Sequence, residues 1–222
     1  MAGKNSRKGI LDPYHQGLLL ISLLLLLLLN PILSELDLRG SRWLLTIFFS
    51  VILFAGIFSV SQTRGVVIAA TLLAIPAFLF RWLNELFVIS DILYHLFDIF
   101  FLFYIGATIL SYVLRPGGAT TGRIFGAVNV YFLIGLTWSF FYSIIHALSP
   151  ASFAVTSPDS SYFLYYSYVT LSTLGYGDIT PLTPVARSFA YMEAMIGQLY
   201  LAVLIARLVG QHIADAGRES TG

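Results

Sequence analysis

Residues 170–178 read Thr-Leu-Ser-Thr-Leu-Gly-Tyr-Gly-Asp and lie between two long apolar stretches, at about 123–148 and 185–209. The aromatic, hydroxyl-rich segment 162–172 leads into this run. It is long enough for a short helix but too short to cross a membrane, which takes about 20 apolar residues. A short helix and an extended return between two spans predict a re-entrant loop. Such backbone is tolerated at membrane depth only where protein buries it or water reaches it.

The composition of the whole chain agrees with a membrane protein. Of its 222 residues, 58% are hydrophobic and 10% are charged, whereas a soluble domain carries about 25% charged residues. The net charge of +1 gives no reason to expect a nucleic-acid partner. The lack of cysteine excludes disulfides and thiolate-bound metals. We therefore predict an all-α membrane protein.

Six stretches are predicted to be transmembrane helices. They lie at about 14–33, 42–61, 65–83, 86–114, 123–148 and 185–209. The first follows three basic residues and resembles a signal peptide, but its length and the lack of a small-residue cleavage pattern favour a retained span. Asn30 and Pro31 are expected to end it. With the loop at 162–178, this pattern predicts six transmembrane helices plus a re-entrant pore helix.

The same pattern divides the chain into five predicted parts. A Pro-Gly-Gly stretch separates the first four helices from the last two and is expected to stop a helix. In order, the parts are a cytoplasmic N-terminus (1–13), a four-helix peripheral domain (14–114), a linker (115–122), a pore domain (123–210) and a cytoplasmic C-terminus (211–222). We expect no appended ligand-binding domain after Gly210.

Basic residues predict the orientation of the helices, because cytoplasmic loops carry an excess of Lys and Arg. On one predicted side lie Lys4, Arg7, Lys8, Arg64, Arg115, Arg123, Arg207 and Arg218. The loops on the opposite side are balanced or acidic in charge, apart from Arg187. Both termini are therefore expected to be cytoplasmic, which agrees with an even number of spans.

Gly175 and Gly177 allow a backbone conformation that can bind a dehydrated cation. A potassium-selective pore replaces the water around the ion with stacked oxygens, and backbone carbonyls hold the ion without trapping it. Successive carbonyls point the same way only where residues leave the right-handed region, which Gly175 and Gly177 do at low cost. We expect the Tyr176 ring to turn away from the ions and pack against the short helix. The predicted K+ sites are the carbonyls of Thr173, Leu174, Gly175 and Tyr176, with the Thr173 hydroxyl below them.

Residues 170–178 resemble the signature of the potassium channel family, with Leu174 where Val or Ile is more usual. The resemblance extends over about 123–210. It implies a homotetramer around one axis, since one loop supplies a quarter of a selectivity filter. It also implies a hinge for the gate at Gly197 in the last helix.

The resemblance further implies a support for the filter. Asp178 matches the acidic residue that in this family commonly bonds an aromatic residue of the pore helix, and Tyr165 or Tyr166 would serve here. Thr170 and Ser172 complete this predicted support. Two polar residues of the last helix, Glu193 and Gln198, are expected either to face the cavity or to bond a neighbouring helix.

An intramembrane aspartyl protease is the rival interpretation. Residues 175–178 also fit Gly-x-Gly-Asp, the motif of those enzymes, which need two carboxylates to activate water. Asp98 or Asp91 would be the partner of Asp178. However, Asp178 follows a re-entrant segment near the outer surface, and the protease leaves the preceding hydroxyl residues unexplained. We therefore expect no catalytic residues.

The first four helices resemble those of voltage-gated channels but lack the charges of a sensor. A sensor needs several Arg or Lys at helical spacing in one span. The fourth stretch instead carries Asp91, His95 and Asp98 on one helical face. They form either a proton-sensitive switch, since His titrates near neutral pH, or a structural network with Arg64 or Arg81, which we favour.

The sequence thus predicts one subunit of a potassium-selective channel in the plasma membrane, without steep voltage gating. K+ is the expected permeant ion, membrane lipid surrounds the protein, and no organic cofactor is expected. The short cytoplasmic parts favour a prokaryotic source. The sequence does not decide how the pore is opened. The alternatives are a constitutive leak, pH, membrane tension, lipid and mild voltage dependence.

Overall fold

The protein is described by a computed structural model for residues 11–35, 41–61, 63–87, 91–118, 120–154 and 160–219. Seven α-helices make up most of the described residues, and the two strands have two residues each. The all-α membrane fold predicted from the sequence is confirmed. The elements are α1 (Pro13–Glu35), α2 (Ser41–Ser59), α3 (Arg64–Phe87), α4 (Asp91–Val113), α5 (Thr121–Leu148), the 3-10 turn η1 (Pro150–Ser152), β1 (Phe153–Ala154), α6 (Ser160–Leu171), β2 (Thr180–Pro181) and α7 (Pro184–Glu219).

Five of the described helices are long and apolar enough to cross a membrane, namely α1, α3, α4, α5 and α7. In α2 the apolar part that is described, Trp43–Ser59, is shorter than the others. The chain is therefore a multi-pass membrane protein. The span predicted at 42–61 stays a prediction.

Two predicted helix boundaries were wrong. α1 does not end at Asn30 and Pro31 but runs on to Glu35. A proline inside a spanning helix is tolerated where neighbouring helices and side chains satisfy the freed backbone groups, and α3 likewise continues through Pro76. The fourth helix, expected from about 86, begins at Asp91, because α3 extends to Phe87.

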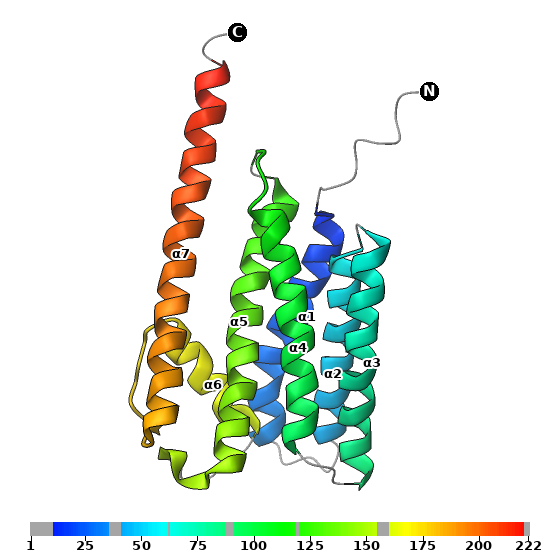
Figure 1. The fold of residues 1–222 in the computed structure, drawn as a ribbon, viewed down its shortest axis with the longest axis vertical. Helices are drawn as coiled ribbons and strands as arrows, with labels where there is room; N and C mark the ends of the chain where they lie inside the picture. The colour runs from blue at the N-terminus through cyan, green and yellow to red at the C-terminus, as the bar shows by residue number, and fades with distance from the viewer. Residues whose placement is uncertain are drawn as a thin grey trace.

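α5 is the central helix of the arrangement. It contacts α1 and α4 of the first four helices and also contacts α6 and α7. Figure 1 shows α7 beside α5, with the short helix α6 next to the first half of α7. Of the α5 span 61% is buried within the chain, but only 11% of the α7 span is. One spanning helix is therefore left almost uncovered.

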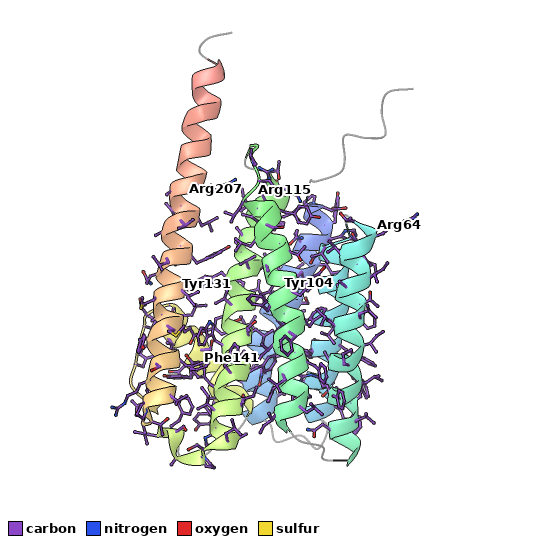
Figure 2. All side chains as sticks on the ribbon, in the orientation of Figure 1. Arg64, Tyr104, Arg115, Tyr131, Phe141 and Arg207 are labelled. Atoms are coloured by element: carbon purple, nitrogen blue, oxygen red, sulfur yellow. The ribbon has the colours of Figure 1, made fainter. Side chains whose placement is uncertain are left out.

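Three of the arginines predicted to be cytoplasmic lie toward one end of the molecule. Figure 2 shows Arg64, Arg115 and Arg207 toward the end at which α5 begins. The guanidinium of Arg207 donates to the carbonyl oxygen of Arg115 at 2.7 Å and also to that of Leu114. These three arginines therefore share one end of the molecule, that this end is cytoplasmic stays a prediction, and Lys4, Arg7 and Lys8 lie outside the described residues.

A buried amide pair ties α1 to α2 and α5. The Gln16 side chain donates to the carbonyl of Ser59 at 2.9 Å. Asn129 Nδ2 donates to the backbone oxygen of Gln16 at 2.9 Å and to its side-chain oxygen at 3.0 Å. Gln16 and Asn129 are both fully buried. Because unpaired amides are costly away from water, these bonds fix α1 against α5.

The docking of α6 on α5 depends on Gly135. A Cβ atom at this position would overlap the ring of Tyr168. The Tyr168 hydroxyl reaches past it and donates to the carbonyl of Phe132 at 2.7 Å. The missing side chain of Gly135 therefore lets the pore helix lie directly against α5.

Replacing Gly135 by Ala is expected to lower the free energy of unfolding by about 1–3 kcal/mol, the usual cost of overpacking. Gly65→Ala is the matched control, because nothing lies within 4 Å of a Cβ at Gly65. The control is expected to be neutral or slightly stabilising. Unfolding of the detergent-solubilised protein measures both. Equal stability of the two variants would contradict this account of the α5–α6 contact.

Candidate functional site

α6 and the residues after it form a loop whose two ends meet. Strand β1 pairs antiparallel with β2, with Phe153 opposite Pro181 and Ala154 opposite Thr180. The backbone N–H of Leu182 also donates to the carbonyl of Ser152 at 2.8 Å. The chain therefore leaves α5, enters through α6, and returns to the same place before α7 begins. The helix predicted at 162–172 is observed at Ser160–Leu171.

The backbone after α6 alternates in handedness. Thr173, Gly175 and Gly177 have φ angles of 59°, 56° and 80°. Leu174 and Tyr176 between them are not among the described residues with positive φ. The sign of φ therefore alternates from residue to residue in this segment, which does not happen in a regular strand.

Thr173 was not predicted to have this conformation. Glycine adopts positive φ readily, but for Thr the left-handed region is strained. The hydrogen bonds that close α6 impose it, since Thr173 N donates to the Thr170 carbonyl at 2.9 Å and Leu174 N to that of Val169 at 2.9 Å. The turn that ends the helix therefore already starts the alternating segment.

The segment 172–178 is exposed in the single chain. Leu174 is 60% exposed and Tyr176 is 68% exposed. The expected packing of the Tyr176 ring against α6 is thus not found within one chain. An apolar leucine and an aromatic ring left open on a membrane protein indicate a surface that something else covers.

Of the two tyrosines that were predicted to bond Asp178, Tyr165 forms the bond. The Tyr165 hydroxyl donates to the Asp178 carboxylate at 2.6 Å, and the backbone N–H of Ile179 donates to its other oxygen at 3.1 Å. The hydrogen bond from Tyr165 lowers the pKa of Asp178 below its usual range. The same bond raises the pKa of Tyr165 to about 12. Tyr166 instead is buried among Tyr142, Phe153 and Phe163.

The other predicted support residues bond within α6. Thr170 shares a side-chain hydrogen bond with Tyr166. The Ser172 hydroxyl donates to the carbonyl of Tyr168 at 2.6 Å. They stabilise the short helix and do not contact Asp178.

Two residues of α7 reach the base of this loop. Gln198 Nε2 donates to the Thr173 hydroxyl at 3.3 Å. Gly197 is buried, and a Cβ there would overlap the carbonyl oxygen of Leu171. α7 is continuous through this position. Gly197 therefore permits close packing, and its predicted role as a hinge stays a prediction.

The predicted cluster of the fourth helix lies in the first four helices, not at the loop. Asp98 is fully buried and forms an ion pair with Arg81 of α3, which is one of the partners expected for the structural network. The Arg81 guanidinium also lies 3.8 Å from the ring centre of Phe49. The His95 ring packs on Phe140 with a centroid separation of 4.9 Å. The side chain of Asp91 lies outside the described residues.

The rival protease interpretation requires Asp178 to face a second carboxylate. Asp178 is exposed and bonds Tyr165, while Asp98 is buried and bonds Arg81. The described residues do not bring these two carboxylates together, so the geometry gives the protease no support.

Glu193 bonds neighbouring helices, which is one of the two alternatives expected for it, but the sequence analysis missed its partners. Glu193, Tyr142 and Ser167 meet in the interior between α7, α5 and α6. The polarity of Glu193 at that depth was a signal, but Tyr142 and Ser167 are ordinary residues in their helices and gave none.

The second half of the chain is similar to known proteins. Residues 124–211 match the family model described as "Ion channel". "Two pore potassium channel c" of Oryza sativa subsp. japonica is 37% identical over 79 residues, which are 36% of this chain and 16% of that protein. "Two-pore potassium channel 5" of Arabidopsis thaliana is 44% identical over 46 residues, 21% of this chain and 11% of that protein. The similarity thus spans a small part of either relative. No solved structure matches the chain significantly.

Removal of the Tyr165 hydroxyl tests the bond to Asp178. Because the folded-state pKa of Asp178 is lowered, the bond contributes stability above the ordinary Asp pKa of about 3.9. That contribution is lost as the pH falls through the lowered value. In Tyr165→Phe the pKa of Asp178 is expected to rise toward the ordinary value. Carbon-13 NMR of the Asp carboxyl groups, titrated against Tyr162→Phe as control, measures it. An unchanged pKa in Tyr165→Phe would show that the bond does not form.

Arg81→Leu tests the buried ion pair. This change leaves the Asp98 carboxylate buried without a counter-charge, so the free energy of unfolding should fall by about 3–5 kcal/mol. The double variant Arg81→Met with Asp98→Leu is expected to recover most of the loss, because no unpaired charge remains. Unfolding in detergent compares the three proteins. A single variant as stable as the wild type would mean that the pair contributes nothing.

Proposed function

We propose that this chain, whose residues 124–211 match the ion channel family, is one subunit of a homotetrameric, potassium-selective channel. The observation that carries the proposal is the alternating backbone at Thr173, Gly175 and Gly177. Carbonyl oxygens presented to one side in succession are what replaces the hydration shell of K+ in a selectivity filter. K+ is the substrate that passes; the predicted sites are the carbonyls of Thr173, Leu174, Gly175 and Tyr176.

The loop has the support that such a filter needs. Tyr165 and Asp178 join the pore helix to the outer end of the segment. Gln198 and the Val169 carbonyl bond its inner end. α6 also points its C-terminal end toward the loop, and the partial negative charge there favours a cation.

The surface that one chain leaves uncovered supports assembly of four copies. One loop supplies one set of carbonyls, whereas a K+ ion in a filter is surrounded by four. The segment 172–178 and most of α7 are exposed in the single chain. Large apolar side chains line that exposed face, including Met192, Met195, Leu199 and Val203. Packing of neighbouring copies would bury this face and complete the ring of oxygens.

The placement of the chain in its membrane is part of the same proposal. With the arginines of Figure 2 at the cytoplasmic side, the start of α7, which follows the filter in the chain, faces outward (Figure 1). The membrane is proposed to be the plasma membrane of a prokaryotic cell, with both termini in the cytoplasm. The proposed division of the chain is four peripheral helices at 14–114, a linker at 115–122 and a pore domain at 123–210, although α5 already begins at Thr121.

Flux of K+ and Na+ into liposomes tests the proposal, with Gly177→Ala as the decisive variant. At Gly177 the φ angle is 80° and nothing lies within 4 Å of an added Cβ. The substitution therefore acts on the backbone conformation and not through crowding. A left-handed non-glycine residue costs about 1–2 kcal/mol, so the K+ to Na+ flux ratio should fall on the order of tenfold.

Gly65→Ala is again the control, because its Cβ also meets open space and its φ is not positive. It should keep the flux ratio of the wild type. The mass of the solubilised wild-type protein should correspond to four chains. Equal selectivity in Gly177→Ala and the wild type, or a folded wild type that is monomeric and passes no K+, would contradict the proposal.

A further inference from the structure

Glu193 lies fully buried in α7, one helical turn before Gly197. Its two carboxyl oxygens meet one hydroxyl each. The Tyr142 hydroxyl of α5 lies 2.5 Å from Oε2, and the Ser167 hydroxyl of α6 lies 2.5 Å from Oε1. The Ser167 oxygen also lies 2.6 Å from the carbonyl of Gly135 in α5. One carboxyl group thus joins three helices.

Counting hydrogens assigns the protonation state of this carboxyl group. Each of the three oxygen–oxygen contacts requires one proton. Tyr142 and Ser167 carry one hydroxyl proton each, and the Gly135 carbonyl can only accept. The third proton must therefore belong to Glu193. Ser167 donates to Gly135, Glu193 donates to Ser167, and Tyr142 donates to the other oxygen of Glu193.

The surroundings of Glu193 agree with a neutral acid. Among the described ion pairs none involves Glu193. The titratable groups that act on it are tyrosines, namely Tyr131 and Tyr142 on α5 and Tyr166 and Tyr168 on α6. A buried carboxylate without a cation is far more costly than a protonated one. Within the part of the chain that the structure describes, Glu193 therefore has no cationic partner that would favour its ionisation.

The contacts of Glu193 continue along α7 in register with α6. Glu193 meets Ser167, Gly197 four residues later meets Leu171, and Gln198 meets Thr173 at the start of the filter. The four-residue steps on both helices are one turn each, so one face of α7 follows one face of the pore helix. The position of α6 relative to α7 thus determines where the filter begins.

We propose that Glu193, in its neutral form, is a positioning residue of the filter, which donates its proton to Ser167 and so holds the pore helix in register with α5 and α7. This inference rests on the proposed channel function for its effect on selectivity. Glu193→Gln preserves the arrangement, because an amide can donate to Ser167 and accept from Tyr142. Glu193→Leu has similar volume but removes the acceptor of the Tyr142 hydroxyl and the donor to Ser167, which keeps only its bond to the Gly135 carbonyl.

The experiment combines an infrared measurement with ion flux. The wild type in lipid at neutral pH should show the carbonyl absorption of a protonated carboxyl group that is missing from Glu193→Gln. In liposomes Glu193→Gln should keep the K+ to Na+ flux ratio. Glu193→Leu should lower this ratio by about tenfold. Ser167→Ala should lower it too, while Ser111→Ala should not, since Ser111 is exposed and bonds only its own helix.

Three outcomes would overturn the inference. No infrared difference between the wild type and Glu193→Gln means that Glu193 is ionised. A flux ratio in Glu193→Gln as low as in Glu193→Leu means that the negative charge matters and not the hydrogen bonds. Wild-type selectivity in Glu193→Leu means that Glu193 only fills space. Absence of K+ flux in the wild type would overturn the proposed function itself, and the infrared difference, which needs no flux, would still decide the protonation.

Discussion

A helix that stops part of the way across a membrane leaves carbonyl groups without partners where no lipid can satisfy them. The rest of this structure depends on how that problem is solved after Leu171. The loop folds back at once, so that Leu174 N caps the Val169 carbonyl. The left-handed turn required for this closure begins the alternation of positive and negative φ that continues to Gly177. The residues after the helix thus form an exposed segment at 172–178 and do not continue the helix.

Such a loop has little stability of its own and depends on the helices around it. α5 contributes a glycine that lets the pore helix lie close, and α7 contributes Gly197 for the same purpose. Polar side chains from both helices then fix the position of α6. The first four helices join this scaffold through α4 and α1, which pack on the other side of α5. Their buried Arg81–Asp98 pair strengthens the peripheral helices without reaching the loop.

The sequence predicted those features that depend on local composition. Apolar length located the helices, and two glycines two residues apart predicted the unusual backbone of the loop. The predictions that failed concern features that depend on the packing of one helix against another. Pro31 normally ends a helix, but in α1 it lies within a spanning helix whose bonds its neighbours complete. Tyr165 and Tyr166 could not be distinguished, because only the packing of α6 on α5 determines which one faces Asp178. Thr173 takes its conformation from the closure of a helix, and Glu193 finds its partners on two distant segments.

The buried amide pair of α1 and α5 has a consequence for biosynthesis. Gln16 and Asn129 are 113 residues apart in the chain. At a synthesis rate of roughly 5–20 residues per second, the first helix waits for about 6 to 23 seconds before its partner is made. Ser59, 43 residues after Gln16, can occupy the side-chain N–H group earlier. α2 can therefore satisfy the side-chain N–H group of Gln16 first. The oxygen atoms of Gln16 wait for Asn129 until α5 leaves the ribosome.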